Sequence, residues 1–167
     1  DTSNGLFANA DWIGSLIYAT VIVMPVIIIT DKSLTRTEQA RIGVIYIIAF
    51  FVIFFWAAYE QAGASLTFFA DEQTDRHIGS WEMPAAYFQS FNPIMIVTLA
   101  PVFAAIWSFL GKRGWEPSSP RKQAIGLLLL SLGYLYIAWG VKDIEPGVKV
   151  SMIWLTGLYL IHTMGEL

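Results

Sequence analysis

Long apolar stretches alternate with short polar ones along nearly the whole chain. Five stretches approach or exceed the roughly 20 apolar residues that a helix needs to cross a hydrocarbon core of about 30 Å. They are residues 12–30, 42–70, 83–111, 124–141 and 150–167. None alternates apolar and polar residues at a period of two, as the strands of an outer-membrane barrel do. The pattern therefore predicts an all-α protein with polytopic transmembrane helices.

The composition of the 167 residues supports a membrane protein. With 56% hydrophobic and 14% charged residues, the chain fits neither a disordered polymer nor an ordinary soluble domain. It contains no cysteine, which excludes disulfides, thiolate metal sites and cysteine nucleophiles. The net charge is −3 and no basic run alternates with aromatic residues, so we expect no nucleic-acid partner. No sequence motif of an enzyme, a metal site or a nucleotide cofactor is present, so we expect neither catalysis nor a cofactor.

The basic residues predict which loops face the cytoplasm. Loops 31–41 and 112–123 carry seven Lys and Arg, whereas connections 71–82 and 142–149 carry six acids. Because positive residues are retained on the cytoplasmic side, we expect the two basic loops inside and the two acidic connections outside. The chain starts without a methionine and its last helix ends at Glu166 and Leu167. We therefore interpret it as a piece of a larger transporter or channel.

Glu60 is an acid in the second apolar stretch. A carboxylate at the middle of a bilayer costs about 2.5–3.5 kcal/mol, so it should face a cavity, pair with a cation or be protonated. Alternatively, it lies near the outer interface and reaches water. Helical spacing would put Trp56, Glu60, Gly63 and Thr67 on one face.

Polar side chains also occur in the third and last stretches. Gln89 and Asn92 precede Pro93 at a spacing of three, so they could share a face of a bent helix and line a polar site. The alternative for Asn92 is a hydrogen bond between helices. Glu166 follows His162 by four residues and would share its face. We expect His162 itself to be a packed, neutral imidazole bonded to a carbonyl.

Glycine recurs at Gly126, Gly133 and Gly140 along the fourth stretch. A stripe of this kind most often allows two helices to pack closely. We therefore predict a helix contact here, without a chemical role.

Three sequence runs together resemble the proton-dependent oligopeptide transporter family of the major facilitator superfamily. They are FWAAYEQ at residues 55–61, FQSFNP at 88–93 and WLTGLYLIHTMGEL at 154–167. They are similar, in order and at suitable separations, to motifs of the family's seventh, eighth and tenth helices. The resemblance implies that residues 1–41 hold an extra helix between the two bundles with a cytoplasmic linker. Residues 42–167 would then be the first four helices, seventh to tenth, of a partial C-terminal bundle.

The resemblance implies a substrate site around three residues. Glu166 matches the acid that holds the amino terminus of the peptide, and Asn92 matches the amide beside it. Trp56 matches an aromatic residue of the pocket.

Two acids match positions linked to proton coupling and gating. Glu60 matches the seventh-helix acid, which also pairs at the outer gate with a basic residue of the N-terminal bundle. For a second gate acid, Asp71 and Glu72 compete, and we choose Glu72.

The resemblance implies proton-coupled symport of di- and tripeptides across the bacterial cytoplasmic membrane by alternating access. The expected partners are the peptides, the lipid bilayer and the missing N-terminal bundle, with protons as the coupling ion and no other cofactor. One alternative is a family member that carries another small nitrogenous solute. Another is a membrane structural or assembly subunit whose buried acids only pair helices.

Overall fold

The computed structural model describes residues 12–142, 145 and 147–167. Residues 1–11 of the segment expected to hold the extra helix and its linker, and Asp143 of the connection expected outside, lie outside the described residues. The chain forms two compact units, Asp1–Phe50 and Phe51–Leu167, and the boundary falls within one long helix. The domain division expected at residue 41 stays a prediction.

The first unit contains helix α1 (Trp12–Thr30) and most of α2 (Arg36–Tyr59). No residue of α1 is buried, and its apolar side chains are suited to contact with lipid. A capping box starts α2: the carboxylate of Glu38 accepts hydrogen bonds from the backbone N–H and the hydroxyl of Thr35, at 2.8 and 2.7 Å. These bonds explain why the helix begins at Arg36, six residues before the apolar stretch.

Four helical segments of the described residues are long and apolar enough to cross a membrane: Trp12–Thr30, Arg36–Glu72, Ala85–Lys112 and Ser119–Val141. They correspond to the first four predicted stretches, which confirms the helical prediction. The fifth stretch also forms a helix, α6 (Met152–Glu166). Its first two predicted residues instead form the short strand β4 (Val150–Ser151).

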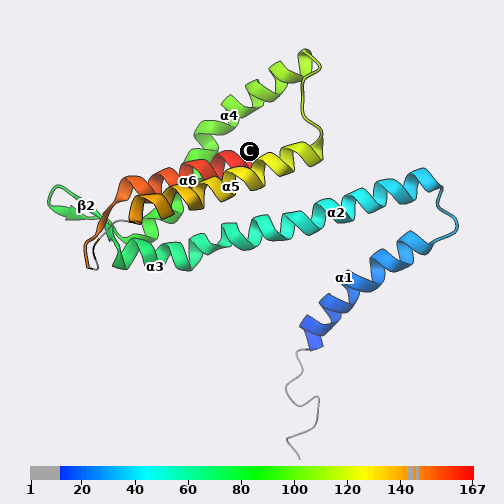
Figure 1. Cartoon of the computed structure of the whole chain (residues 1–167), viewed down its shortest axis with the longest axis horizontal. Helices are drawn as coiled ribbons and strands as arrows, with labels where there is room; N and C mark the ends of the chain where they lie inside the picture. The colour runs from blue at the N-terminus through cyan, green and yellow to red at the C-terminus, as the bar shows by residue number, and fades with distance from the viewer. Residues whose placement is uncertain (1–11, 143–144, 146) are drawn as a thin grey trace, which may run out of the picture. The chain divides into compact units, whose positions relative to one another are not determined.

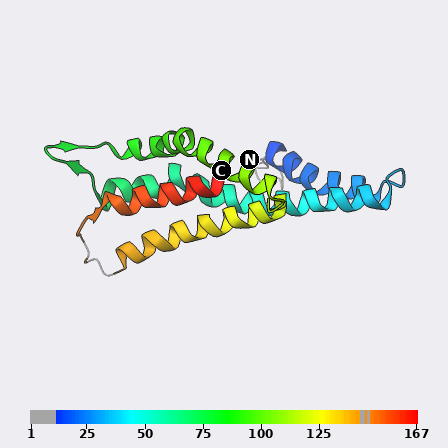
Figure 2. The ribbon, with the colours of Figure 1, turned by 90° about the horizontal axis from the view of Figure 1, so that it is seen from above.

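Helices α5 (Ser119–Val141) and α6 run side by side in the second unit, as Figures 1 and 2 show. The glycine stripe of α5 makes this contact possible, because a methyl group at any of its three positions would collide with α6. The facing pairs are Gly126 with Gly165, Gly133 with His162, and Gly140 with Trp154. The prediction of close helix packing is confirmed.

The second apolar stretch is not one continuous helix. After Tyr59 the chain forms a 3-10 turn, η1 (Glu60–Gly63), and then helix α3 (Ser65–Glu72). At the junction, Ala64 adopts φ −123° and ψ −94°, which is not helical. Side-chain hydroxyls satisfy carbonyls at the break: Tyr134 donates to Ala58 O at 2.6 Å, and Thr67 donates to Ala62 O at 2.8 Å.

The third stretch begins with a 3-10 segment, η2 (Ala85–Ser90), and continues as helix α4 (Phe91–Lys112), which lies against α6. The buried core of the unit lies between α3, η2, α5 and α6. It comprises Leu66, Ala70, Met83, Phe88, Ile137, Leu155, Leu158 and Tyr159.

Short strands join the two connections that were expected outside. Strand β1 (Thr74–Asp75) pairs in parallel with β4, so connections 71–82 and 142–149 lie at the same end of this unit. Strands β2 (His77–Ile78) and β3 (Trp81–Glu82) form an antiparallel hairpin, seen at the left of Figure 1. Gly79 in its turn has φ +65°, a conformation that favours glycine.

Candidate functional site

The carboxylate of Glu166 is the centre of a polar cluster formed by three helices. Its Oε2 atom accepts a hydrogen bond from the hydroxyl of Tyr59 at 2.8 Å and another from the side-chain amide of Asn92 at 3.0 Å. Tyr59 ends α2, Asn92 lies in the first turn of α4, and Glu166 ends α6. No donor among the described residues reaches Oε1, so this oxygen remains available to a ligand.

Thr163 extends the cluster along α6. Its hydroxyl donates to the carbonyl of Tyr159 at 2.8 Å and accepts from the amide nitrogen of Asn92 at 3.1 Å. The Asn92 amide has two N–H groups, and one bonds to each of Thr163 and Glu166. Both acceptors belong to α6, so α6 determines how this amide is oriented.

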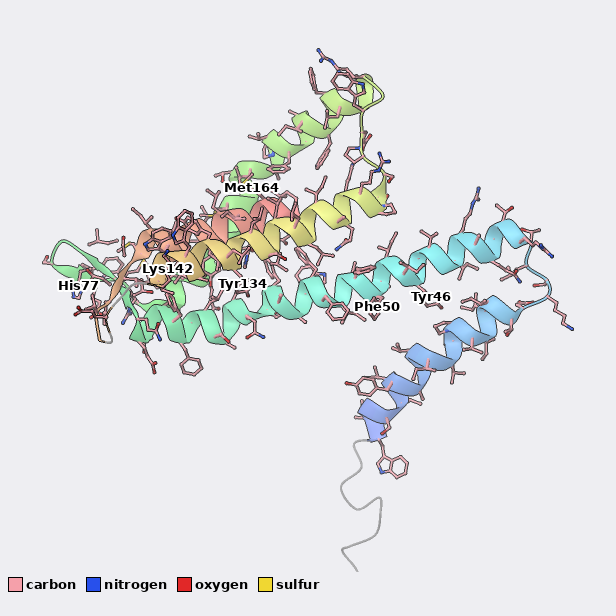
Figure 3. The ribbon with its side chains drawn as sticks, viewed as in Figure 1. Tyr46, Phe50, His77, Tyr134, Lys142 and Met164 are labelled. Atoms are coloured by element: carbon pink, nitrogen blue, oxygen red, sulfur yellow. The ribbon has the colours of Figure 1, made fainter. Side chains whose placement is uncertain are left out.

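Aromatic rings surround the hydroxyl that contacts Glu166. The ring of Tyr59 stacks on Phe55 at 5.8 Å and meets Trp56 edge to face at 5.3 Å. Trp56 and Glu166 line one open cleft of about 360 Å³, together with Trp107, Lys122 and other residues of α2, α4, α5 and α6. Met164, labelled in Figure 3, lines the same cleft.

Glu60 and Glu72 make no described hydrogen bond or ion pair with this cluster. Glu60 begins η1, where its side chain is exposed and makes no described hydrogen bond or ion pair. Glu72 ends α3, also exposed and without a described partner. The competing acid Asp71 has a partner, because its carboxylate lies 2.9 Å from the guanidinium of Arg76.

His162 and Gln89 make their contacts away from Glu166 and Asn92. His162 does not share the site of Glu166: it is 2% exposed, its Nε2 lies 3.1 Å from Leu130 O, and its ring packs against Tyr134. This is the packed imidazole that we expected. Gln89 does not join Asn92 either, because it lies in η2 and its amide donates to the hydroxyl of Thr67 at 3.0 Å.

The 3-10 turn η1 after the end of α2 also overturns one predicted face, that of Trp56, Glu60, Gly63 and Thr67. Trp56 is helical, but Glu60 and Gly63 belong to the 3-10 turn and Thr67 belongs to α3. The four residues therefore do not follow a single helical repeat.

Sequence reasoning missed two members of the cluster, Tyr59 and Thr163. Thr163 precedes Glu166 by three residues, and this helical spacing could have predicted it. For Tyr59 the only signal was its place three residues after Trp56 and next to Glu60. Its contact with Glu166 spans 107 residues of sequence, so no local pattern indicates it.

The cluster is suited to binding a cation. A half-buried carboxylate with two neutral donors on one oxygen can form a charge-assisted hydrogen bond through the other oxygen with a ligand ammonium group. The described residues contain no group of three or more His, Cys, Asp or Glu that could hold a metal ion.

Comparison with known proteins gives a consistent result. A profile of the POT family matches residues 6–167. The chain is 34% identical over 154 residues to the peptide transporter YePEPT of Yersinia enterocolitica, covering 91% of this chain and 30% of that protein. It is 31% identical over 134 residues to dipeptide and tripeptide permease B of Salmonella typhimurium, covering 80% and 27%.

Solved structures resemble the chain equally well. The peptide transporter POT in complex with sulfate matches with a TM-score of 0.80 and 35% identity, over 92% of this chain and 31% of that one. A POT family transporter in complex with 5-aminolevulinic acid matches with a TM-score of 0.77 and 27% identity, over 95% and 34%. The chain thus spans about a third of the length of the relatives that it matches.

Proposed function

The chain belongs to the POT family, and we propose that it acts in proton-driven symport of di- and tripeptides across the bacterial cytoplasmic membrane. POT transporters are multi-pass membrane proteins, and this chain has four helices suited to crossing a bilayer. The similar proteins include a peptide transporter and di- and tripeptide permeases. Protons are the coupling ion in this proposal, and no other cofactor takes part.

One observation carries the substrate assignment: Oε2 of Glu166 is held by Tyr59 and Asn92, while Oε1 has no described donor. A free peptide offers an ammonium at its amino terminus, which can pair with that oxygen. Glu166 is the ammonium-binding acid, Asn92 is the amide that orients it, and Trp56 forms an aromatic wall of the pocket. The carboxylate of the peptide would bind a cation supplied by the N-terminal bundle.

Glu60 and Glu72 are proposed to couple protons and to gate the outer side. Glu60 is the first residue of the 3-10 turn that directly follows Tyr59. A shift of this turn would therefore also move Tyr59, which contacts Glu166. Neither acid has a described partner, which leaves both free to pair with cations of the N-terminal bundle. The ion pair between Asp71 and Arg76 supports Glu72 over Asp71 as the second gate acid.

The proposed orientation has loops 31–41 and 112–123 in the cytoplasm. The pairing of β1 with β4 supports it, because the two acidic connections meet at one end of the unit. Two cations of the basic loop 112–123 have partners: Lys122 bonds to Glu116 at 2.6 Å, and the guanidinium of Arg113 lies 4.2 Å from the ring centroid of Phe109.

A second candidate substrate is a small amino acid derivative. One similar transporter was solved in complex with 5-aminolevulinic acid. Such a molecule has an ammonium and a carboxylate, as a peptide does, so Glu166 would bind it by the same contact. Competition between such a solute and a dipeptide would separate the two candidates.

The substrate assignment is tested by changing Glu166 to glutamine in the intact protein. Calorimetry should show that Glu166→Gln weakens binding of a free dipeptide by about ten- to a hundredfold, since a hydrogen bond to a charged group contributes about 1.5–3 kcal/mol. An N-acetylated dipeptide lacks the ammonium, so it should bind the wild type weakly and lose little. Glu145→Gln, in the exposed outer connection, serves as the control and should bind both ligands as the wild type does. Equal losses for the two ligands, or no loss, would contradict the assignment of Glu166.

A further inference from the structure

Tyr59 is held in place by the rings around it. Its ring stacks on Phe55 at an interplanar angle of 17° and meets Trp56 at 71°. On another side lies His162, with ring centroids 6.3 Å apart. These contacts restrict the phenol ring, so its hydroxyl reaches Glu166 with little loss of side-chain entropy on forming the bond.

The two donors to Glu166 differ in what they connect. Asn92 bonds to both Thr163 and Glu166, so both of its hydrogen bonds join α4 to α6. The hydroxyl of Tyr59 is the only donor from α2 to this acid among the residues that the structure describes. It therefore joins the ammonium-binding acid to the helix end that immediately precedes Glu60.

Glutamate has three side-chain torsions, and a single hydrogen bond from the Asn92 amide leaves its carboxylate free to rotate. A second donor on the same oxygen restricts the rotation and determines where Oε1 points. A phenol is suited to this role because it donates one strong hydrogen bond to a carboxylate without adding charge.

We propose that Tyr59 is a positioning residue for substrate selection: its hydroxyl holds Glu166 in the orientation that presents Oε1 to the ammonium of the peptide. The inference rests on the proposed function, in which Glu166 binds that ammonium. Tyr59 contributes to affinity only through Glu166, so its effect should appear only with ligands that carry the ammonium.

The test is Tyr59→Phe in the intact protein, which keeps the ring and removes the hydroxyl. Calorimetry should show about tenfold weaker binding of a free dipeptide and unchanged binding of its N-acetylated form. In uptake assays KM for the free dipeptide should rise while kcat stays constant. The matched control is Tyr134→Phe, which removes another interhelical hydroxyl bond but not one to Glu166, and should change binding of the two ligands by the same factor.

The double variant distinguishes positioning from general packing. In a Glu166→Gln background, Tyr59→Phe should weaken binding of the free dipeptide by less than about twofold, because the carboxylate that Tyr59 orients is gone. A full loss in that background, or equal losses for free and acetylated ligands with Tyr59→Phe alone, would overturn the role of Tyr59. If Glu166→Gln weakens binding of the free dipeptide more than that of the acetylated one, and Tyr59→Phe does not, only this inference fails. If Glu166→Gln itself shows no selectivity, the proposed function of the site fails as well.

Discussion

Tyr134 donates its phenolic hydrogen to the backbone carbonyl of Ala58 at 2.6 Å, and this bond joins α5 to the last turn of α2. Figure 3 labels Tyr134 on α5. Carbonyls in the last turn of a helix lack a full set of intrahelical partners, and the hydroxyl supplies one. The bond therefore stabilises the end of α2 just before Glu60, where the chain changes to a 3-10 turn.

For Glu60 we predict that Glu60→Gln separates proton coupling from peptide binding. The amide keeps nearly the same size but cannot ionise, so uphill uptake driven by a proton gradient should be lost. Exchange of peptide down its own gradient should remain. Uptake and counterflow in proteoliposomes measure the two activities, with Glu145→Gln as the control. Unchanged accumulation against a gradient would remove Glu60 from the coupling mechanism.

The contact between α5 and α6 predicts the effect of filling one glycine. In Gly126→Ala the new methyl group would lie 2.6 Å from the backbone oxygen of Gly165, so a helix must shift. Overpacking of this kind costs about 1–3 kcal/mol. The midpoint of thermal unfolding in detergent should fall. In Gly43→Ala the methyl group meets nothing within 4 Å, so this control should leave the midpoint unchanged or slightly higher.

Arg76 links the hairpin of β2 and β3 to α3. Its guanidinium lies 2.9 Å from both Asp71 and Glu82 and donates to Met83 O at 2.8 Å, while its side chain is only 11% exposed. Because the two carboxylates are exposed, we expect Arg76→Met to cost about 1–2 kcal/mol.

Hydrogen exchange measured by mass spectrometry tests this role of Arg76. Amides of residues 74–83 should exchange roughly tenfold faster in Arg76→Met, whereas those of α5 should not change. The exposed Lys149→Met is the control. Exchange that stays at the wild-type rate in the hairpin would mean that the strands hold it without Arg76.

Asp75, in strand β1 beside the hairpin, predicts a local pH dependence. Hydrogen bonds from the side chain and the backbone N–H of His77 lower the pKa of Asp75. A carboxyl group with a lowered pKa stabilises the folded loop at pH values above its ordinary pKa of about 3.9. This contribution is lost as the pH falls through the lowered pKa. In His77→Ala the pKa of Asp75 should rise towards the ordinary value, as measured by carboxyl carbon NMR. A pKa of Asp75 that does not change in His77→Ala would assign the shift to the backbone hydrogen bond alone.

The orientation proposed for the membrane predicts a labelling pattern. In an otherwise cysteine-free version of the intact protein, Ser80→Cys should react in intact cells with an impermeant thiol reagent, whereas Ser118→Cys should not. Both positions are exposed in the structure, so access from either side of the membrane decides the result. Permeabilised cells, in which both should react, provide the control. The reverse pattern would invert the topology.

The sequence alone determined the helical class, the approximate extents of the apolar segments and the packing face of α5. These features depend on local rules: a helix must be long and apolar to cross a bilayer, and glycines seven residues apart lie on one face. The motifs also pointed to Glu166 and Asn92, which the structure brings within 3.0 Å of each other. Their roles in binding remain proposals.

Only the tertiary structure decided how the cluster around Glu166 is built. Tyr59 lies 107 residues from Glu166 in sequence, and Tyr134 lies 76 residues from Ala58. Nothing in the apolar pattern of residues 42–70 indicated a break, because the hydroxyls that satisfy the freed carbonyls include one from another helix. The direction of a polar side chain inside a helical bundle depends on which partner lies within hydrogen-bonding distance, and that is known only once the helices have packed.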